Sequence, residues 1–88
     1  MGKVEIVTGA LRAVEGDKRW GNAIMRAAEP FLADAPAEMQ GAFERALMYS
    51  ATSSQCQCEA GKHDLPCKHK ALIRLLELQA ASEAEVVA

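Results

Sequence analysis

Large aromatic side chains are scarce in this sequence, which contains one Trp, one Tyr and two Phe among 88 residues. Half of the residues are apolar, but many of these are alanine, which buries little surface. A chain of this length is expected to form one domain, and so small a domain buries only about 60% of the surface that its unfolded chain exposes. The hydrophobic core alone is therefore expected to be marginal.

A long apolar run and an excess of basic residues are also missing. No stretch approaches the ~18 consecutive apolar residues of a membrane span, and the N-terminus lacks the pattern of a signal peptide, so we expect a cytoplasmic protein that does not associate with membranes. Ten Lys and Arg residues against twelve Asp and Glu residues give a net charge of −2. Dedicated nucleic-acid binders usually have a basic balance, so the overall charge argues against strong nucleic-acid affinity.

The first segment, residues 3–15, is ambiguous. Its β-branched residues at positions 4, 6, 7 and 8 favour a strand. The spacing of its apolar residues favours a helix instead, as shown by Val4, Val7, Leu11 and Val14. We favour a helix in the second half of this segment and leave residues 3–8 open.

Two further helices are predicted between residues 17 and 47. Asp17 suits an N-cap, and Pro30 is expected to kink or end this helix near Glu29. The pattern restarts at residues 34–36, where Pro36 suits a first helical position. The predicted buried faces are Trp20, Ile24, Ala27 and Phe31 in the first of these helices and Met39, Phe43, Ala46 and Leu47 in the second.

Small hydroxyl residues interrupt the helical pattern over residues 50–55. Such residues favour extended or turn backbone, so we expect a short strand or hairpin arm that leads into Cys56. Gly61 and the residues after it predict a turn, and Pro66 marks the start of a last helix. The predicted buried face of that helix is Ala71, Leu72, Leu75, Leu76 and Gln79.

Three cysteines and a histidine form the pattern that carries chemistry: Cys56-Gln57-Cys58, eight residues, then Cys67-Lys68-His69. In a reducing compartment, an odd number of closely spaced cysteines indicates metal ligands rather than disulfides. Three thiolates and one imidazole are a standard closed set for tetrahedral zinc. We therefore predict one structural zinc ion bound by Cys56, Cys58, Cys67 and His69. Because four protein ligands leave no open position, we expect no catalytic residues, no enzyme activity and no small-molecule substrate.

Two alternatives concern the same residues. The cysteines could be buried or redox-active thiols that bind no metal. His63, in the loop between the two pairs, is a fifth candidate ligand that could replace His69 only if the loop folds inward.

The two pairs, with Pro66 before the second pair and an apolar helix after it, resemble the SWIM-type zinc finger, whose pattern is CxC, a variable gap and CxH. The resemblance covers roughly residues 48–78. It implies a short β-hairpin that carries Cys56 and Cys58, followed by a helix whose start carries Cys67 and His69. The predicted fold class is therefore α+β and mostly helical, as a single domain. N-terminal helices over about 1–47 pack on a small β-hairpin-plus-helix zinc finger over about 48–80, and residues 81–88 form a frayed tail.

The resemblance implies binding to proteins or DNA. We expect a small accessory or regulatory factor that acts through protein–protein interaction, with a protein partner or as a homodimer, because the acidic balance and the helical first half favour it. The alternative is nucleic-acid binding through the basic residues around the metal. These residues are Lys62, Lys68, Lys70 and Arg74.

Overall fold

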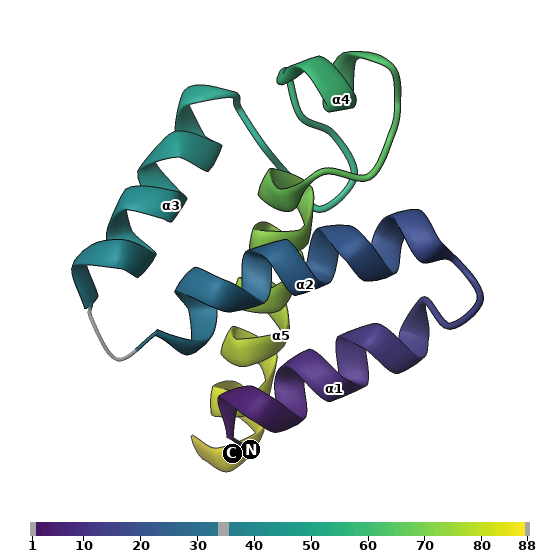
Figure 1. Ribbon diagram of the computed structural model, residues 1–88. Helices are drawn as coiled ribbons and strands as arrows, with labels where there is room; N and C mark the ends of the chain where they lie inside the picture. Colours follow the sequence, from purple (N-terminus) through teal and green to yellow (C-terminus); the bar gives the residue numbers. More distant parts are fainter. Residues whose placement is uncertain (1, 34–35, 88) are drawn as a thin grey trace.

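Helix α5 is the centre of a fold that consists of helices and loops. The computed structural model describes residues 2–33 and 36–87. The helices in these ranges are α1 (Lys3–Ala13), α2 (Lys18–Leu32), α3 (Pro36–Met48), α4 (Glu59–Lys62) and α5 (Lys68–Val87). Helices α1 and α2 lie side by side, α5 crosses them, and α3 packs against α5 near its start, while α4 stands in the loop above that end (Figure 1).

Helix α1 settles the ambiguity of the first segment, since residues 3–8 are helical as well. Ile6, Val7 and Ala10 are buried, whereas Val4, which the predicted stripe included, is 66% exposed. The preference of β-branched residues for strands is weak, and packing against α2 and α5 overrides it.

Helix α2 begins as predicted, because the Asp17 carboxylate accepts a hydrogen bond of 3.2 Å from the Trp20 amide. Of the kink or stop that was predicted near Glu29, the stop is wrong, since the helix continues past Pro30 to Leu32. Proline removes only one backbone hydrogen bond, and so close to the C-terminus this affects the last turn alone.

The hydrophobic core lies between α1, α2 and α5. Its largest fully buried side chains are Phe31, Ile24 and Leu75. Alanines supply much of the rest, which lets the helices approach closely but limits the buried area. The prediction for the last helix is confirmed for Ala71, Leu72 and Leu75, which are all buried.

Helix α3 covers the start of α5 with a narrow face. Pro36 is its first residue, as predicted, while residues 34 and 35 lie outside the described ranges. Of the predicted buried face, only Ala46 is fully buried and Met39 is partly buried. Phe43 and Leu47 are 37% and 55% exposed.

The predicted α+β class is wrong, because neither a strand nor a β-hairpin occurs in residues 2–33 and 36–87. Ser50 adopts a left-handed conformation (φ 52°) that turns the chain at the end of α3. The Thr52 hydroxyl then accepts hydrogen bonds from the amides of Ser54 (3.2 Å) and Gln55 (2.9 Å). Local side-chain bonds of this kind compete with a strand ladder. Two backbone hydrogen bonds cross this turn, one from the Thr52 amide to the Gln55 carbonyl (2.7 Å) and one from the Gln57 amide to the Tyr49 carbonyl (2.9 Å).

Helix α5 extends to Val87, so it includes most of the segment that the sequence assigned to a tail; Ala88 lies outside the described residues. No helix in the described part of the chain combines the length and the hydropathy needed to cross a membrane.

Candidate metal centre

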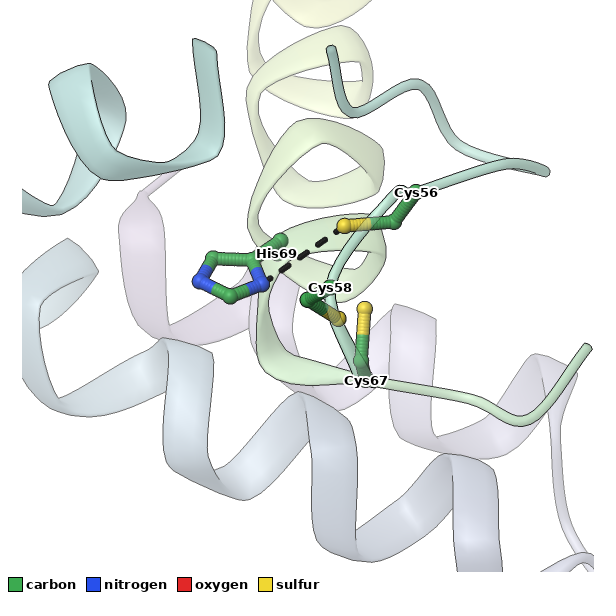
Figure 2. A group of neighbouring side chains, drawn as sticks. All are labelled: Cys56, Cys58, Cys67 and His69. Atoms are coloured by element: carbon green, nitrogen blue, oxygen red, sulfur yellow. Dashed lines mark hydrogen bonds between the residues drawn. The ribbon is translucent and has the colours of Figure 1, made fainter. Parts of the chain in front are cut away.

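The four predicted ligands meet at the N-terminal end of α5. The sulfurs of Cys56, Cys58 and Cys67 and a ring nitrogen of His69 all lie within 4.8 Å of one another. Figure 2 shows the three sulfurs and the imidazole turned toward a common centre. Cys56 Sγ and His69 Nδ1 lie 3.6 Å apart.

Each ligand takes its position from the local backbone. Cys56 follows the turn after α3, Cys58 is the N-cap of α4, Cys67 directly precedes α5, and His69 lies in the first turn of α5. The sequence predicted this helix start and the place of His69 in it. Cys58 has the predicted extended conformation (φ −70°, ψ 171°) although it is not part of a strand.

Two backbone amides donate hydrogen bonds to the sulfurs. The Gly61 amide lies 3.4 Å from Cys58 Sγ, and the Lys70 amide lies 3.4 Å from Cys67 Sγ. In both cases the donor belongs to the first turn of the helix that follows the cysteine, so that each sulfur caps a helix N-terminus. Such donors and the positive end of the helix dipole stabilise a thiolate, and they fix the direction in which the sulfur points.

Gly61 permits a close approach between α4 and Cys56. A Cβ atom at position 61 would overlap the carbonyl oxygen of Cys56 and would lie 2.6 Å from its carbonyl carbon. The backbone of α4 therefore packs directly on the backbone of a ligand residue, which only glycine allows. The sequence placed Gly61 in a turn but gave no sign of this contact.

The protonation of the thiols differs between the two cysteines of the first pair. Burial raises the pKa of Cys56 to about 11. Burial also acts to raise the pKa of Cys58, but the hydrogen bond from the Gly61 amide and the interactions with the neighbouring thiols of Cys56 and Cys67 outweigh it, so that its pKa is lowered. A metal ion must therefore displace at least the Cys56 proton near neutral pH.

The surroundings of His69 favour its neutral form, which is the form that binds a metal ion. Burial and the positive charges of Lys68 and Arg45 lower its pKa. The ring of Tyr49 lies against the imidazole, with the two centroids 4.9 Å apart and an angle of 38° between the planes. This contact connects the end of α3 to the cluster, and no sequence motif indicated it.

The geometry fits a tetrahedral metal ion after a small contraction. Zinc–sulfur and zinc–nitrogen bonds of about 2.3 Å and 2.0–2.1 Å place neighbouring ligand atoms ~3.4–3.8 Å apart. The contact between Cys56 and His69, at 3.6 Å, already has this length, and the largest separation is 4.8 Å. Buried soft donors of this kind could hold a metal ion.

The other candidate residues lie elsewhere. His63 is exposed, with Nε2 3.6 Å from a carboxylate oxygen of Glu59, and does not join the cluster. Lys62 and Lys68 are exposed. Lys70 is only 3% exposed, and its ammonium group donates to the Leu65 carbonyl at 3.1 Å.

Arg74 packs its guanidinium over the ring of Trp20, with 3.9 Å between the guanidinium carbon and the ring centroid. Two of the four basic residues that the sequence assigned to a nucleic-acid face, Lys70 and Arg74, are thus engaged within the fold.

No protein-family model, curated protein or solved structure matches this chain. The cluster of Cys56, Cys58, Cys67 and His69 is therefore identified from its own geometry, as a candidate site for one metal ion.

Proposed function

We propose that this chain is a non-enzymatic zinc-binding module in which one structural zinc ion, held as in a SWIM-type finger by Cys56, Cys58, Cys67 and His69, organises the loop between α3 and α5. The observation that carries this proposal is the composition of the loop. Among residues 50–67, the buried side chains are Cys56 and Cys67, which are 6% and 8% exposed. The loop thus has no apolar core of its own, and its interior consists of candidate ligands.

A structural role agrees with the closed ligand set. Four protein donors complete a tetrahedron and leave no position for a substrate or for an activated water. The binding energy of such sites, about 10–16 kcal/mol in small zinc peptides, becomes folding energy where no site preforms. We infer that zinc replaces the hydrophobic core that the loop lacks.

Metal analysis with a matched pair of variants tests this proposal. Native mass spectrometry of the purified chain is expected to show one zinc ion per molecule. The variant His69→Asn should lose the zinc, whereas His63→Asn should retain it, because His63 lies outside the cluster. Retention of zinc in both variants, or a wild-type chain without stoichiometric metal, would contradict the proposed ligand set.

We further propose that the module acts as an accessory or regulatory factor through a protein–protein contact made by the α3 apolar edge. This edge consists of Phe43, Leu47, Met48 and Tyr49, whose exposed fractions range from 37% to 79%. Exposed apolar groups that adjoin one another are typical of interaction sites. The edge ends at the metal centre, since Tyr49 lies against His69.

Site-specific crosslinking tests this contact in cells. A photoreactive benzoylphenylalanine at position 48 is expected to capture a protein partner or a second copy of the chain. The same residue at the exposed position 15, in the turn between α1 and α2, serves as the control. Equal yields at both positions, together with a monomeric mass at high concentration by sedimentation, would reject the proposed surface.

The nucleic-acid alternative has less support from the fold. Lys70 and Arg74 make contacts within the chain, which leaves Lys62 and Lys68 as the exposed members of the proposed basic face. Two exposed lysines make few phosphate contacts, so only weak binding that disappears at moderate salt would be expected.

A further inference from the structure

A pocket of about 390 Å³ lies beside the metal centre, between α2, α3 and α5. Its size falls in the range of small-molecule sites. Small apolar residues form its base. Ionisable side chains surround them, namely Arg26 and Glu29 from α2, Glu38 and Arg45 from α3, and Lys68 and His69 from α5.

The charges in this pocket are separated along its length. Arg45 follows Glu38 by seven residues, so it lies about 10 Å further along α3, toward the metal loop. Lys68 and His69 begin α5 at that same end. Glu29 lies in the last part of α2, close in sequence to the start of α3 and to Glu38. Arg45, Lys68 and His69 therefore lie toward the end of the pocket that faces the metal loop, and Glu38 lies toward the other end.

Within the described residues, the cationic groups of the pocket lack a carboxylate partner. No ion pair within 4.0 Å involves Arg26, Arg45 or Lys68. The Nε atom of Arg45 donates to the Gly41 carbonyl at 3.3 Å, which leaves the terminal N–H groups of its guanidinium for another acceptor.

We propose that the pocket binds a small ligand through an oxyanion group, a carboxylate or a phosphate, that lies between Arg45 and Lys68 with Arg26 beside them. An anion at this position would relieve the repulsion between the cations. The planar guanidinium groups suit either oxyanion, because two parallel N–H donors match two oxygens.

The imidazole of His69 supplies a second reason, which rests on the proposed zinc site. Figure 2 shows one ring nitrogen directed at Cys56 and the other directed away from the sulfurs. A metal-bound imidazole usually donates its second N–H to an oxygen acceptor. In the described part of the chain, the sole hydrogen-bond contact of the His69 side chain is the one to Cys56. This nitrogen is not a buried atom without a partner, so it reaches solvent, and a ligand oxygen in the pocket would take the place of water as its acceptor.

Titration of the isotope-labelled full chain with inorganic phosphate tests the proposal, with sodium chloride used to hold the ionic strength constant. Saturable shifts in amide NMR spectra are expected for residues 26–29, 42–45 and 68–72. A parallel titration with acetate distinguishes the two oxyanions. The variant Arg45→Gln should bind about tenfold more weakly, as expected for loss of a charge-assisted hydrogen bond. Arg12→Gln, which removes an exposed cation from α1, should bind as the wild type does.

The variant Glu38→Gln gives a result that a folding defect cannot imitate, because removal of a negative charge from the pocket should strengthen phosphate binding. Three results would overturn the proposal. They are NMR shifts that rise without saturation for both anions, equal losses of phosphate affinity in Arg45→Gln and Arg12→Gln, and a phosphate affinity in Glu38→Gln that does not exceed that of the wild type. If Arg45→Gln does not fold, Arg26→Gln replaces it. Saturable binding to a chain that holds no zinc would support the pocket while it overturns the proposed zinc site.

Discussion

Substitution of Gly61 by alanine tests the contact between α4 and the metal centre. The new Cβ atom would lie 2.6 Å from the carbonyl carbon of Cys56, whereas ordinary contacts begin at 3.4 Å. Helix α4 and Cys56 must therefore separate by at least about 0.8 Å, and by more to clear the carbonyl oxygen, which lies closer still to the new Cβ atom. Metal–ligand distances tolerate changes of only about 0.2 Å, so this separation disturbs the position of the Cys56 sulfur or that of the Cys58 sulfur.

The expected cost of this overlap is about 1–3 kcal/mol, the range for atoms forced into packed regions. It corresponds to a zinc affinity about 5- to 150-fold lower than that of the wild type. Competition with a chromophoric chelator measures the affinity, and thermal unfolding of the zinc-loaded chain measures the accompanying loss of stability. The backbone of Gly61 has no positive φ, so the overlap alone would cause the loss.

Gly9→Ala is the matched control. Gly9 lies inside α1, and a Cβ atom there would meet no atom within 4 Å. Because alanine favours a helix interior over glycine by roughly 0.5–1 kcal/mol, this variant should melt a few degrees higher and keep its zinc affinity. If Gly61→Ala also binds zinc as tightly as the wild type and melts at the same or a higher temperature, α4 does not pack on Cys56 as described.

Three further outcomes are expected. Zinc affinity should rise by about tenfold or more per pH unit between pH 6 and 8, because the metal must displace the proton of Cys56, whose pKa is about 11. Below the usual pKa of histidine, protonation of His69 should weaken zinc binding further. A series of chelator competitions that shows no pH dependence would contradict this. Ser50→Gly should stabilise the chain by about 0.5–1 kcal/mol, because Ser50 has a left-handed backbone conformation (φ 52°) that glycine adopts without strain. Thermal unfolding measures this effect, and a melting temperature below that of the wild type would contradict the strain at Ser50. Lys70→Met should lower the free energy of unfolding by about 1–3 kcal/mol, because it leaves the Leu65 carbonyl without its hydrogen-bond donor. Chemical denaturation measures this loss, and an unchanged midpoint would show that the hydrogen bond does not stabilise the fold.

The sequence predicted the candidate metal site better than the fold around it. Ligands one residue apart must lie close together, and the rigid approach through Pro66 places Cys67 and His69 at a helix start, so that local chain geometry was sufficient. The hairpin was predicted wrongly because hydroxyl residues such as Thr52 favour both extended backbone and tight turns. The bonds from the amides of Ser54 and Gln55 to the Thr52 hydroxyl, which decide between the two, become visible only in the structure.

Sequence patterns did not predict the contacts between segments that are distant in the chain. The α3 stripe was predicted from periodicity, but which part of it is buried depends on how α3 lies against α5, and the structure buries Ala46 while it leaves Leu47 exposed. The pocket combines residues more than 40 positions apart, such as Arg26 and Lys68. Neither residue belongs to a motif that would mark it.

The position of α5 couples metal binding to the rest of the chain. Its first turn carries His69, and its next two turns place Leu72 and Leu75 in the core between α1 and α2. A metal ion bound to His69 would therefore also fix the start of a core helix, and the core holds this candidate ligand in place without the metal. Because Tyr49 lies against His69, the same ion would also restrain the end of the α3 apolar edge. Loss of zinc should thus alter the proposed protein-binding surface even where the helical core survives.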